Sequence, residues 1–317
     1  ANESYAYWGG GTNTVGFEST SIFRLDLSND TTNAPQTGNL SAVGQDFSAV
    51  GNNSYGYING DSKTRVDRID YSSDSSTTAV KGNLNQTRVY PGAAGNTSYG
   101  WFGGGGPSRS SIDRIDYSND TATAETKSKF STGNFGYGAA TGSADYGYFM
   151  GGSPQPSGGS NIHRLDYAND TADTVLKGNL SSVRTSTLGA FSGQAEGLSS
   201  AATPITPASR TETGTTAPAG TNYGYFGGGN SGSPFLSSIE RIDFGNDTAT
   251  AAPKGNLSTG RSAAGSVGSN SYGYVARGRI GPGSTNNSSV DRIDYSNDTA
   301  TALARGSLTS DRRDVVS

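Results

Sequence analysis

Apolar and charged positions follow one fixed order around an arginine that recurs six times along the chain. An aliphatic residue lies two positions before the arginine, another follows it directly, and an aspartate lies two positions beyond it. The six arginines are Arg24, Arg68, Arg114, Arg164, Arg241 and Arg292. The corresponding aspartates are Asp26, Asp70, Asp116, Asp166, Asp243 and Asp294. A repeat of this length is typical of a solenoid or a propeller, so it decides the fold class.

Each repeat divides into four short segments with the composition of β-strands. A run of small residues comes first, as in Ala263–Ser266, and an aromatic run that ends in glycines follows, as in Tyr223–Gly229. The aliphatic and acidic run is third, and a Thr-Ala-Thr-Ala run leading to Lys-Gly-Asn-Leu is fourth. Aromatic and β-branched residues bounded by Gly, Asn, Asp and Ser indicate strands, and no window shows sustained helical spacing of apolar residues.

The spacing predicts an all-β protein, a six-bladed β-propeller with four-stranded antiparallel blades. Successive arginines are 44, 46, 50, 77 and 51 residues apart, and all intervals but one match the length of a four-stranded blade. We therefore expect residues 1–317 to form a single propeller. The long interval contains residues 193–220, which are rich in Ser, Thr, Ala, Pro and Gly. We expect this segment to be an insertion without a core of its own.

The two ends of the sequence carry complementary parts of one blade. The sequence opens on an aromatic second strand at Tyr5–Gly11, whereas its last residues align with the small-residue first strand of another repeat. We therefore expect Arg313–Ser317 to pair beside Asn2–Trp8, so that the C-terminal strand joins the N-terminal blade and closes the ring. The first strands are expected to be innermost, because bulky side chains do not fit where six strands converge.

The order of these four segments resembles the kelch repeat. The resemblance rests on glycine pairs after the aromatic strand, at Gly9–Gly10, Gly103–Gly104, Gly151–Gly152 and Gly227–Gly228. It also rests on an arginine that opens the first strand, at Arg88, Arg184, Arg261 and Arg312. The chain lacks the tryptophan usual in the fourth strand of that family, so its outer strands must pack differently. The repeated phrases are also similar to those of repeat proteins of marine cyanophages, which are loosely described as tail-fibre-like.

The recurring arginine and aspartate are interpreted as structural. They lie two positions apart on one strand and therefore share a face, and each blade face of a propeller packs on its neighbour. Buried charges need partners, and the simplest arrangement is an ion pair between the two residues of each repeat. Six identical copies cannot line one asymmetric active site. The Ser-Asn-Asp-Thr segments that follow, such as 118–121, are interpreted as turns, because Asn and Asp tolerate left-handed backbone.

Composition argues against several classes of site. The chain has no cysteine and a single histidine, His163, so neither a thiolate site nor a zinc site is expected. His163 occupies the position that Asp67, Asp113 and Asp291 hold in other repeats, and it is expected to replace a polar partner there. The net charge of −4 and the lack of a basic run argue against nucleic-acid binding. No apolar stretch approaches 18 residues, so membrane insertion is not expected, and no motif suggests a cofactor.

The connections between second and third strands are the candidate recognition loops. They differ in length and composition from repeat to repeat, and binding residues favour loops on a rigid scaffold. They carry aromatic rings, amides and charges of the kind that bind sugars. These candidates are Asn13, Phe17, Lys63, Arg109, Gln155, Phe235, Arg279, Asn286 and Asn287. The alternative is that the loops vary because nothing constrains them.

The predicted function is that of a non-enzymatic virion or extracellular fibre component that recognises a host-surface glycan or protein. The competing interpretation is an architectural subunit that decorates a capsid or assembles into filaments. Residues 193–220, if they are ordered, are expected to be held by a neighbouring subunit or blade. A third hypothesis is a glycan-processing enzyme, since aspartates are plentiful. No singular acidic pair stands out from the repeat, so an enzyme is not expected.

Overall fold

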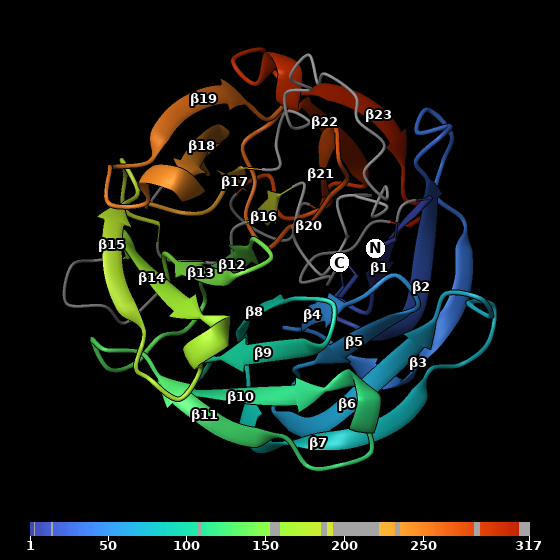
Figure 1. Ribbon diagram of the computed structural model, residues 1–317. Coiled ribbons are helices and arrows are strands. Elements are labelled where there is room, and N and C mark those ends of the chain that lie inside the picture. Colours follow the sequence, from blue (N-terminus) through green and yellow to red (C-terminus); the bar gives the residue numbers. More distant parts are fainter. Residues whose placement is uncertain are drawn as a thin grey trace, which may run out of the picture.

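The computed structural model describes residues 1–2, 4–13, 15–106, 109–152, 159–184, 189–192, 222–231, 235–281 and 286–310. These residues form six antiparallel sheets arranged as blades around a central axis (Figure 1). The chain is therefore an all-β, six-bladed propeller, as the repeat predicts, and its architecture is compatible with a kelch-like repeat protein. No helix in this described part of the chain is long and apolar enough to span a membrane.

The strands follow one another through each sheet in sequence order. Blade 1 contains β1 (Tyr5–Gly9), β2 (Ser19–Asp26) and β3 (Gln36–Gly44). Blade 2 contains β4 (Ser48–Gly51), β5 (Tyr55–Asn59), β6 (Lys63–Asp70) and β7 (Ala79–Arg88). Blade 3 contains β8 (Gly92–Gly95), β9 (Tyr99–Gly103), β10 (Ser111–Asp116) and β11 (Glu125–Lys129).

The other three blades repeat the same order. Blade 4 contains β12 (Ala139–Gly142), β13 (Tyr146–Met150), β14 (Asn161–Asp166) and β15 (Val175–Asn179). Blade 5 contains β16 (Gly189–Ser192), β17 (Tyr223–Gly227), β18 (Ser238–Asp243) and β19 (Ala252–Asn256). Blade 6 contains β20 (Gly265–Gly268), β21 (Tyr272–Ala276), β22 (Ser289–Asp294) and β23 (Leu303–Ser307). Short 3-10 turns follow four of the third strands, namely η1 (Tyr117–Asn119), η2 (Tyr167–Asn169), η4 (Phe244–Asn246) and η5 (Tyr295–Asn297).

The small-residue strands lie innermost, as expected. Strands β4, β8, β12, β16 and β20 surround the centre of the ring, and the fourth strand of each blade forms its circumference (Figure 1). The neighbouring inner strands β4, β8, β12, β16 and β20 contact one another in succession. Small side chains allow this approach, because six blades must converge on one axis.

The fourth strands begin later than the sequence predicts. Residues 121–124 continue the turn of blade 3, and β11 begins only at Glu125. The Ala122 amide donates to the Asn119 carbonyl within this turn, and the Ala124 amide donates to the Asn83 carbonyl of the preceding blade. The Thr-Ala-Thr-Ala segment is therefore bound to the neighbouring blade instead of pairing within its own sheet.

The hydrophobic core of the described residues is divided into six clusters, one between each pair of adjacent blades. Each second strand contributes four buried residues in a row, because one of its faces packs on the next blade and the other on the preceding blade. This explains why the aromatic run is not interrupted by exposed polar residues.

Glycine in the fourth strand allows five of the blades to receive the turn of the next blade, whereas blade 3 has Ser128 at this position. The Gly178 amide donates to the Asp247 carbonyl at 2.7 Å, and a Cβ at Gly178 would overlap the carbonyl oxygen of Ala249. Corresponding backbone oxygens lie against Gly38, Gly82, Gly255 and Gly306. The glycine of the Lys-Gly-Asn segment is therefore required by the approach of the neighbouring backbone.

The ring closes through direct contact between blades 6 and 1. Ala34 of blade 1 forms a parallel bridge with Leu308, and the Ala34 amide donates to the Ser307 carbonyl at 2.9 Å. Arg292 and Asp30 form an ion pair across the same boundary. The predicted pairing of Arg313–Ser317 beside Asn2–Trp8 and the predicted insertion at 193–220 lie outside the described residues.

Candidate functional site

The two flat faces of the propeller are built from different connections. One face carries the connections from second to third strands and from each fourth strand to the next blade, and we call it the loop face. The opposite face carries the first-to-second and third-to-fourth connections, and we call it the turn face. Since the strand order is the same in every blade, all six candidate recognition loops leave the ring on the loop face.

The turn face repeats one inter-blade joint six times. The recurring arginine of each third strand forms an ion pair with an aspartate in the third-to-fourth turn of the next blade. The six pairs are Arg24–Asp74, Arg68–Asp120, Arg114–Asp170, Arg164–Asp247, Arg241–Asp298 and Arg292–Asp30, at 2.7–3.0 Å. The second-strand aromatic of the arginine's own blade donates to the same carboxylate. These donors are Tyr7, Tyr57, Trp101, Tyr148, Tyr225 and Tyr274, at 2.8–3.1 Å.

The predicted ion pair within each third strand was therefore wrong about the partner. The aspartate two residues beyond the arginine ends the strand and caps the turn that follows. In blade 3, Asp116 accepts a hydrogen bond from the Ser118 amide, whereas Arg114 reaches Asp170 of blade 4. The other five aspartates of this position (Asp26, Asp70, Asp166, Asp243 and Asp294) accept the equivalent amide bond. The turn aspartate, which the sequence analysis treated as local turn chemistry, joins the blades.

Burial at this joint keeps its aromatic hydroxyls protonated. Loss of hydration raises the pKa of Tyr7, Tyr57, Tyr148, Tyr225 and Tyr274, and the neighbouring carboxylate raises it further. Each arginine also lies over the first tyrosine of its second strand, as Arg241 does at 4.0 Å from the ring centroid of Tyr223. These contacts use the charges of the turn face for holding blades together.

The loop face is held by fully buried arginines at the starts of three blades. Arg88, Arg184 and Arg261 have side chains that are 0% exposed, and they pair with Asp113, Glu240 and Asp291 at 2.6–3.0 Å. Burial lowers the pKa of Arg88 and of Arg261, and the paired carboxylate opposes that change. Their donors are used inside the protein, so these arginines have a structural role. Arg312 lies outside the described residues.

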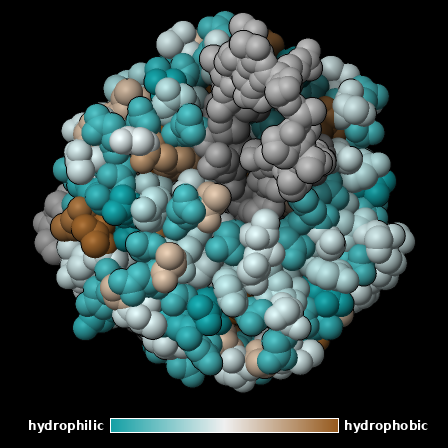
Figure 2. Space-filling view, in the orientation of Figure 1, coloured by the Kyte–Doolittle hydropathy of each residue, from teal (hydrophilic) through white to brown (hydrophobic). Residues whose placement is uncertain are grey.

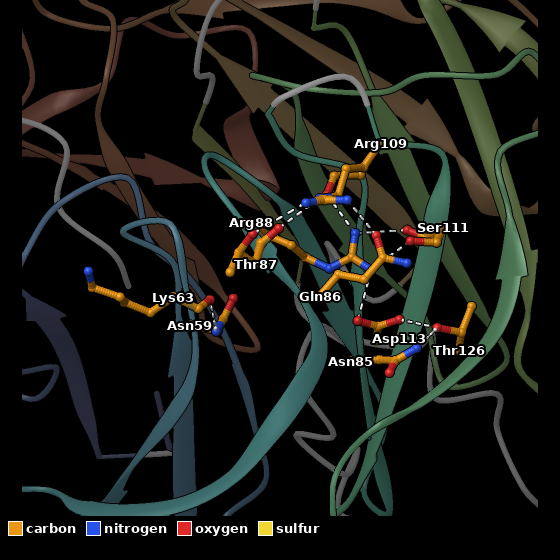
Figure 3. Close-up of polar contacts among 11 residues, drawn as sticks. Asn59, Lys63, Asn85, Gln86, Thr87, Arg88, Arg109, Ser111, Asp113 and Thr126 are labelled. Carbon is orange, nitrogen blue, oxygen red and sulfur yellow. Dashed lines mark hydrogen bonds and ion pairs between the residues drawn. The ribbon is translucent and has the colours of Figure 1, made fainter.

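Each buried arginine fixes both ends of a recognition loop. Arg88 donates to the carbonyl of Gly104, where the second strand ends, and to the carbonyl and hydroxyl oxygens of Ser111, where the third strand begins. Figure 3 shows Arg88, Ser111 and Asp113 converging, with Thr126 extending the chain of hydrogen bonds from Asp113. Arg184 and Arg261 bind the corresponding carbonyls in blades 5 and 6. The loops therefore stand on rigid stems.

Blade 4 replaces the buried ion pair with a histidine among aromatic rings. His163 is fully buried, and its two ring nitrogens lie 3.1 and 3.2 Å from the hydroxyl oxygens of Thr132 and Thr174. The rings of Phe130 and Phe135 contact the imidazole edge to face. Burial lowers the pKa of His163 to about 4, so the imidazole is neutral at pH 7. His163 thus replaces a carboxylate, as the alignment of repeats indicates.

Blades 1 and 2 use two further substitutes. In blade 2, Arg65 of the third strand pairs with buried Asp67 at 3.3 Å. In blade 1, Phe23 takes the acidic position, and Arg277 of blade 6 lies over its ring at 4.4 Å. The contacts that hold the loop face therefore differ among blades, whereas the arginine–aspartate pair of the turn face occurs at all six joints.

Backbone strain is concentrated on the loop face. Among the described residues, seven that are not glycine have φ between 50° and 64°: Asp46, Asp61, Ser62, Tyr90, Tyr137, Ala263 and Arg277. All seven lie in connections of this face. Such residues persist only where the surrounding structure over-determines them, and they gather at binding and catalytic sites.

The first recognition loop exposes two apolar side chains at its tip. Asn13 accepts hydrogen bonds from the amides of Val15 and Phe17 at 3.1 and 2.9 Å, so its side chain shapes the loop. Val15 is 72% exposed and Phe17 is 71% exposed. Exposed large side chains on a folded turn are available for contact with a partner.

The structure brings three other candidates together between blades 5 and 6. The Arg279 guanidinium lies 5.8 Å from the centroid of the Phe235 ring, and Arg279 also forms a bridge with Asn286. Asn286 is 9% exposed, and Asn287 uses its side-chain oxygen to accept from the Ser289 amide at 2.8 Å. Phe235 and Arg279 therefore form one composite surface, whereas Asn287 shapes its own loop.

The remaining candidates are separate from these two groups. Lys63 is exposed at the start of β6. Arg109 donates to the Thr87 carbonyl at 2.8 Å and to the Gln86 side-chain oxygen at 2.7 Å, as Figure 3 shows, so its charge is held by the neighbouring connection. Gln155 lies outside the described residues.

One aromatic pair on the loop face was missed by the sequence analysis. Tyr90 and Tyr137 lie in successive connections between blades, with ring centroids 4.8 Å apart, and Tyr137 is 37% exposed. Both have positive φ. The available signal was a tyrosine beside a glycine or proline in two neighbouring blade-to-blade connections, which the search of second-to-third-strand loops did not include.

The candidate residues of the loop face offer aromatic, amide and cationic groups. Across the described ranges, no three His, Asp or Glu side chains lie close enough to hold a metal ion. Comparison of the chain with models of protein families finds no match. Comparison with curated protein sequences finds none either.

Proposed function

We propose that the protein is a binding module of a virion or extracellular fibre and that its loop face recognises a host-surface glycan. The observation that carries this proposal is the contrast between rigid stems and variable loops. Buried arginines fix both ends of the loops in blades 3, 5 and 6, and the loop of blade 1 exposes Val15 and Phe17 at its tip. Aromatic and apolar groups on a rigid support bind partners at low cost in conformational entropy.

Two further observations support this function. Positive φ values in residues other than glycine are concentrated on the loop face, and they include those of Tyr90 and Tyr137. The repeated phrases of the chain are also similar to those of marine cyanophage proteins described as tail-fibre-like. A fibre component that meets a cell surface needs a rigid scaffold whose loops can differ. The repeated blades of this chain provide the scaffold, and the connections between second and third strands differ from blade to blade.

Glycan-array binding tests the proposal. The variant Val15→Ser with Phe17→Ser removes the two most exposed apolar side chains of the loop face, and we expect at least a ten-fold loss of binding. The matched control is Asn119→Ser with Asn246→Ser, which changes two exposed turn-face residues and should bind as the native protein does. Equal binding by the two variants would contradict the proposal.

A second candidate function is an architectural subunit that assembles through its circumference. The outermost strands are sheet edges, and four apolar residues near their beginnings are 45–57% exposed, namely Val80, Val175, Leu176 and Leu303. Figure 2 shows apolar atoms gathered at the rim over β15, which contains Val175 and Leu176. Exposed apolar edges favour association with other chains.

Light scattering distinguishes the second function from the first. An architectural subunit should form larger particles as its concentration rises, and Val175→Ser with Leu176→Ser should reduce that association. A glycan-binding monomer should keep one mass over the same range and retain array binding in this rim variant.

A further inference from the structure

The joint between blades 6 and 1 differs from the other five joints in one side chain. In those five, an aromatic ring follows the last aspartate of the third strand and stacks on the preceding blade. The stacked pairs are Tyr71 on Tyr7, Tyr117 on Tyr57, Tyr167 on Trp101, Phe244 on Tyr148 and Tyr295 on Tyr225, with centroids 4.1–5.0 Å apart. Blade 1 has Leu27 at this position, beside Tyr274 of blade 6.

A second change in blade 1 matches the first. The residue between the two aromatics of the second strand is glycine in the other blades and Ala6 in blade 1. A Cβ at Gly56 of blade 2 would lie only 2.7 Å from the Tyr71 hydroxyl oxygen. The methyl group of Ala6 therefore leaves no room for a tyrosine at position 27. Ala6 in place of glycine and Leu27 in place of an aromatic residue together leave the joint between blades 6 and 1 without a ring stacked on Tyr274.

A cavity of about 600 Å³ lies at this joint, on the turn face. Its apolar lining comes from Leu27 and from the rings of Tyr5, Tyr272 and Tyr274. Tyr5 and Tyr272 are partly exposed, with Arg24 and Arg292 held over their rings at 4.5 and 4.3 Å. The volume is within the range of small-ligand sites in proteins.

The polar lining of the cavity consists largely of hydrogen-bond acceptors and hydroxyl groups. Asn270 forms part of the wall, but its side-chain oxygen has almost no accessible surface and is not available to a ligand. Asp26 lies at the edge of the cavity, and the bonds it accepts from Ser28 lower the pKa of its carboxyl group. Ser271 adds a hydroxyl group. Such a lining suits a ligand that supplies hydroxyl donors and disfavours an anion.

We propose that this cavity binds one neutral pyranose unit of a glycan. A pyranose has apolar C–H faces that pack on tyrosine rings, and its hydroxyl groups can donate to the carboxylate of Asp26 and to the hydroxyl oxygen of Ser271. The site lies on the face opposite the recognition loops and is formed by different residues. Its existence is therefore independent of the function proposed above.

Saturation-transfer NMR on the intact protein tests this site. The probes are the methyl glycosides of glucose, galactose and mannose, with glucuronate as an anionic comparison. The double variant Ala6→Gly with Leu27→Tyr rebuilds the filled joint that Gly56 and Tyr71 form in blade 2. We expect at least one neutral glycoside to bind the native protein, to bind this variant at least ten-fold more weakly, and to bind more tightly than glucuronate.

A matched control and a second variant complete the experiment. Tyr117→Phe changes an aromatic at a joint that is already filled, and it should leave the glycoside signal unchanged. Ser271→Ala should weaken binding about five-fold, the effect of one lost hydrogen bond, and it tests the site if the double variant does not fold. Equal glycoside binding by the native and folded variant proteins would overturn the proposal. Binding of p-cresol without any glycoside signal would overturn it as well, because the cavity would then be an apolar gap.

Discussion

The turn face and the loop face hold the same six blades together by different means. On the turn face every joint uses an arginine, a second-strand aromatic and the turn aspartate of the next blade, and none of the six departs from this set except in Trp101 for tyrosine. On the loop face three blades use a buried arginine with a carboxylate, and three use other solutions. The difference shows that the turn face needs the same contact at every joint, whereas the contacts of the loop face vary with the loop that each blade carries.

Removing a buried arginine of the loop face should have the largest effect on stability. Arg88→Ala leaves Asp113 without its partner in a site that is 0% exposed, and it frees the carbonyl groups of Gly104 and Ser111. We expect the free energy of unfolding to fall by about 3–5 kcal/mol. Urea unfolding measures this change, and a loss no larger than that of Arg114→Ala would remove the distinction between the two faces.

The histidine in blade 4 should make the loop face sensitive to acid. The pKa of His163 is about 4 in the folded protein and about 6.5 when unfolded. As the pH falls below 6.5, the unfolded chain takes up the proton first, so stability decreases until the pH passes about 4. The expected loss is about 3 kcal/mol.

The acid effect is measured by comparison with His163→Gln, which retains hydrogen-bonding groups toward Thr132 and Thr174 but cannot titrate in this range. Unfolding is followed in urea at pH 7 and at pH 4 for both proteins, so the contribution of the carboxyl groups cancels. If the two proteins lose equal stability on acidification, His163 is not the source of the effect.

A side chain on the fourth-strand glycine should disturb the inter-blade contact of the turn face. Gly178→Ala places a methyl group against the Ala249 carbonyl, and we expect a loss of about 1–3 kcal/mol. Gly281→Ala is the control, because a Cβ there meets no atom within 4 Å. Equal melting temperatures for both variants would show that the turn moves aside without cost.

Removing one arginine of the turn face should have the smallest effect of this series. The Arg114 side chain is 23% exposed, and Asp170 retains the hydrogen bond from Trp101. We expect Arg114→Ala to lower the free energy of unfolding by about 1–2 kcal/mol. A loss above 3 kcal/mol in urea unfolding would show that the six joints act cooperatively instead of separately.

The architecture was predictable because each repeat contains the four strand segments of one blade in order. Six copies of a phrase with strand composition define blade number, strand order and the inner position of the small-residue strands, and the structure confirms each. The partner of the recurring arginine was not predictable in the same way. Asp116 and Asp120 are both near Arg114 in the sequence, and each has a counterpart in every repeat. The partner of Arg114 is Asp170, which is the counterpart of Asp120 in the next blade. Which carboxylate an arginine meets depends on the rotation between blades, and spacing within one repeat does not encode that angle.

The common face of the candidate loops was predictable from the strand order, whereas the surroundings of single residues were less so. Phe17 is exposed at the tip of its loop, and the Phe235 ring lies beside the Arg279 guanidinium. Arg109 donates to the Thr87 carbonyl of the preceding blade, whereas Asn287 accepts from the Ser289 amide beside it in the sequence. The cavity beside Leu27 could have been suspected from the one repeat that lacks an aromatic after its last aspartate.

The inter-blade joint of the turn face has a direction, because each blade offers a donor on one side and an acceptor on the other. Arg292 of the last blade meets Asp30 of the first blade with the same chemistry that joins blades in the middle of the chain. The ion pair at this joint therefore does not determine the number of blades. The number of blades is instead governed by the wedge shape of each unit, set by how closely the small inner strands approach. A chain with one blade duplicated would therefore form the same arginine–aspartate pair at every joint of the turn face, so a ring of this kind can gain a blade by copying a unit without changing that pair.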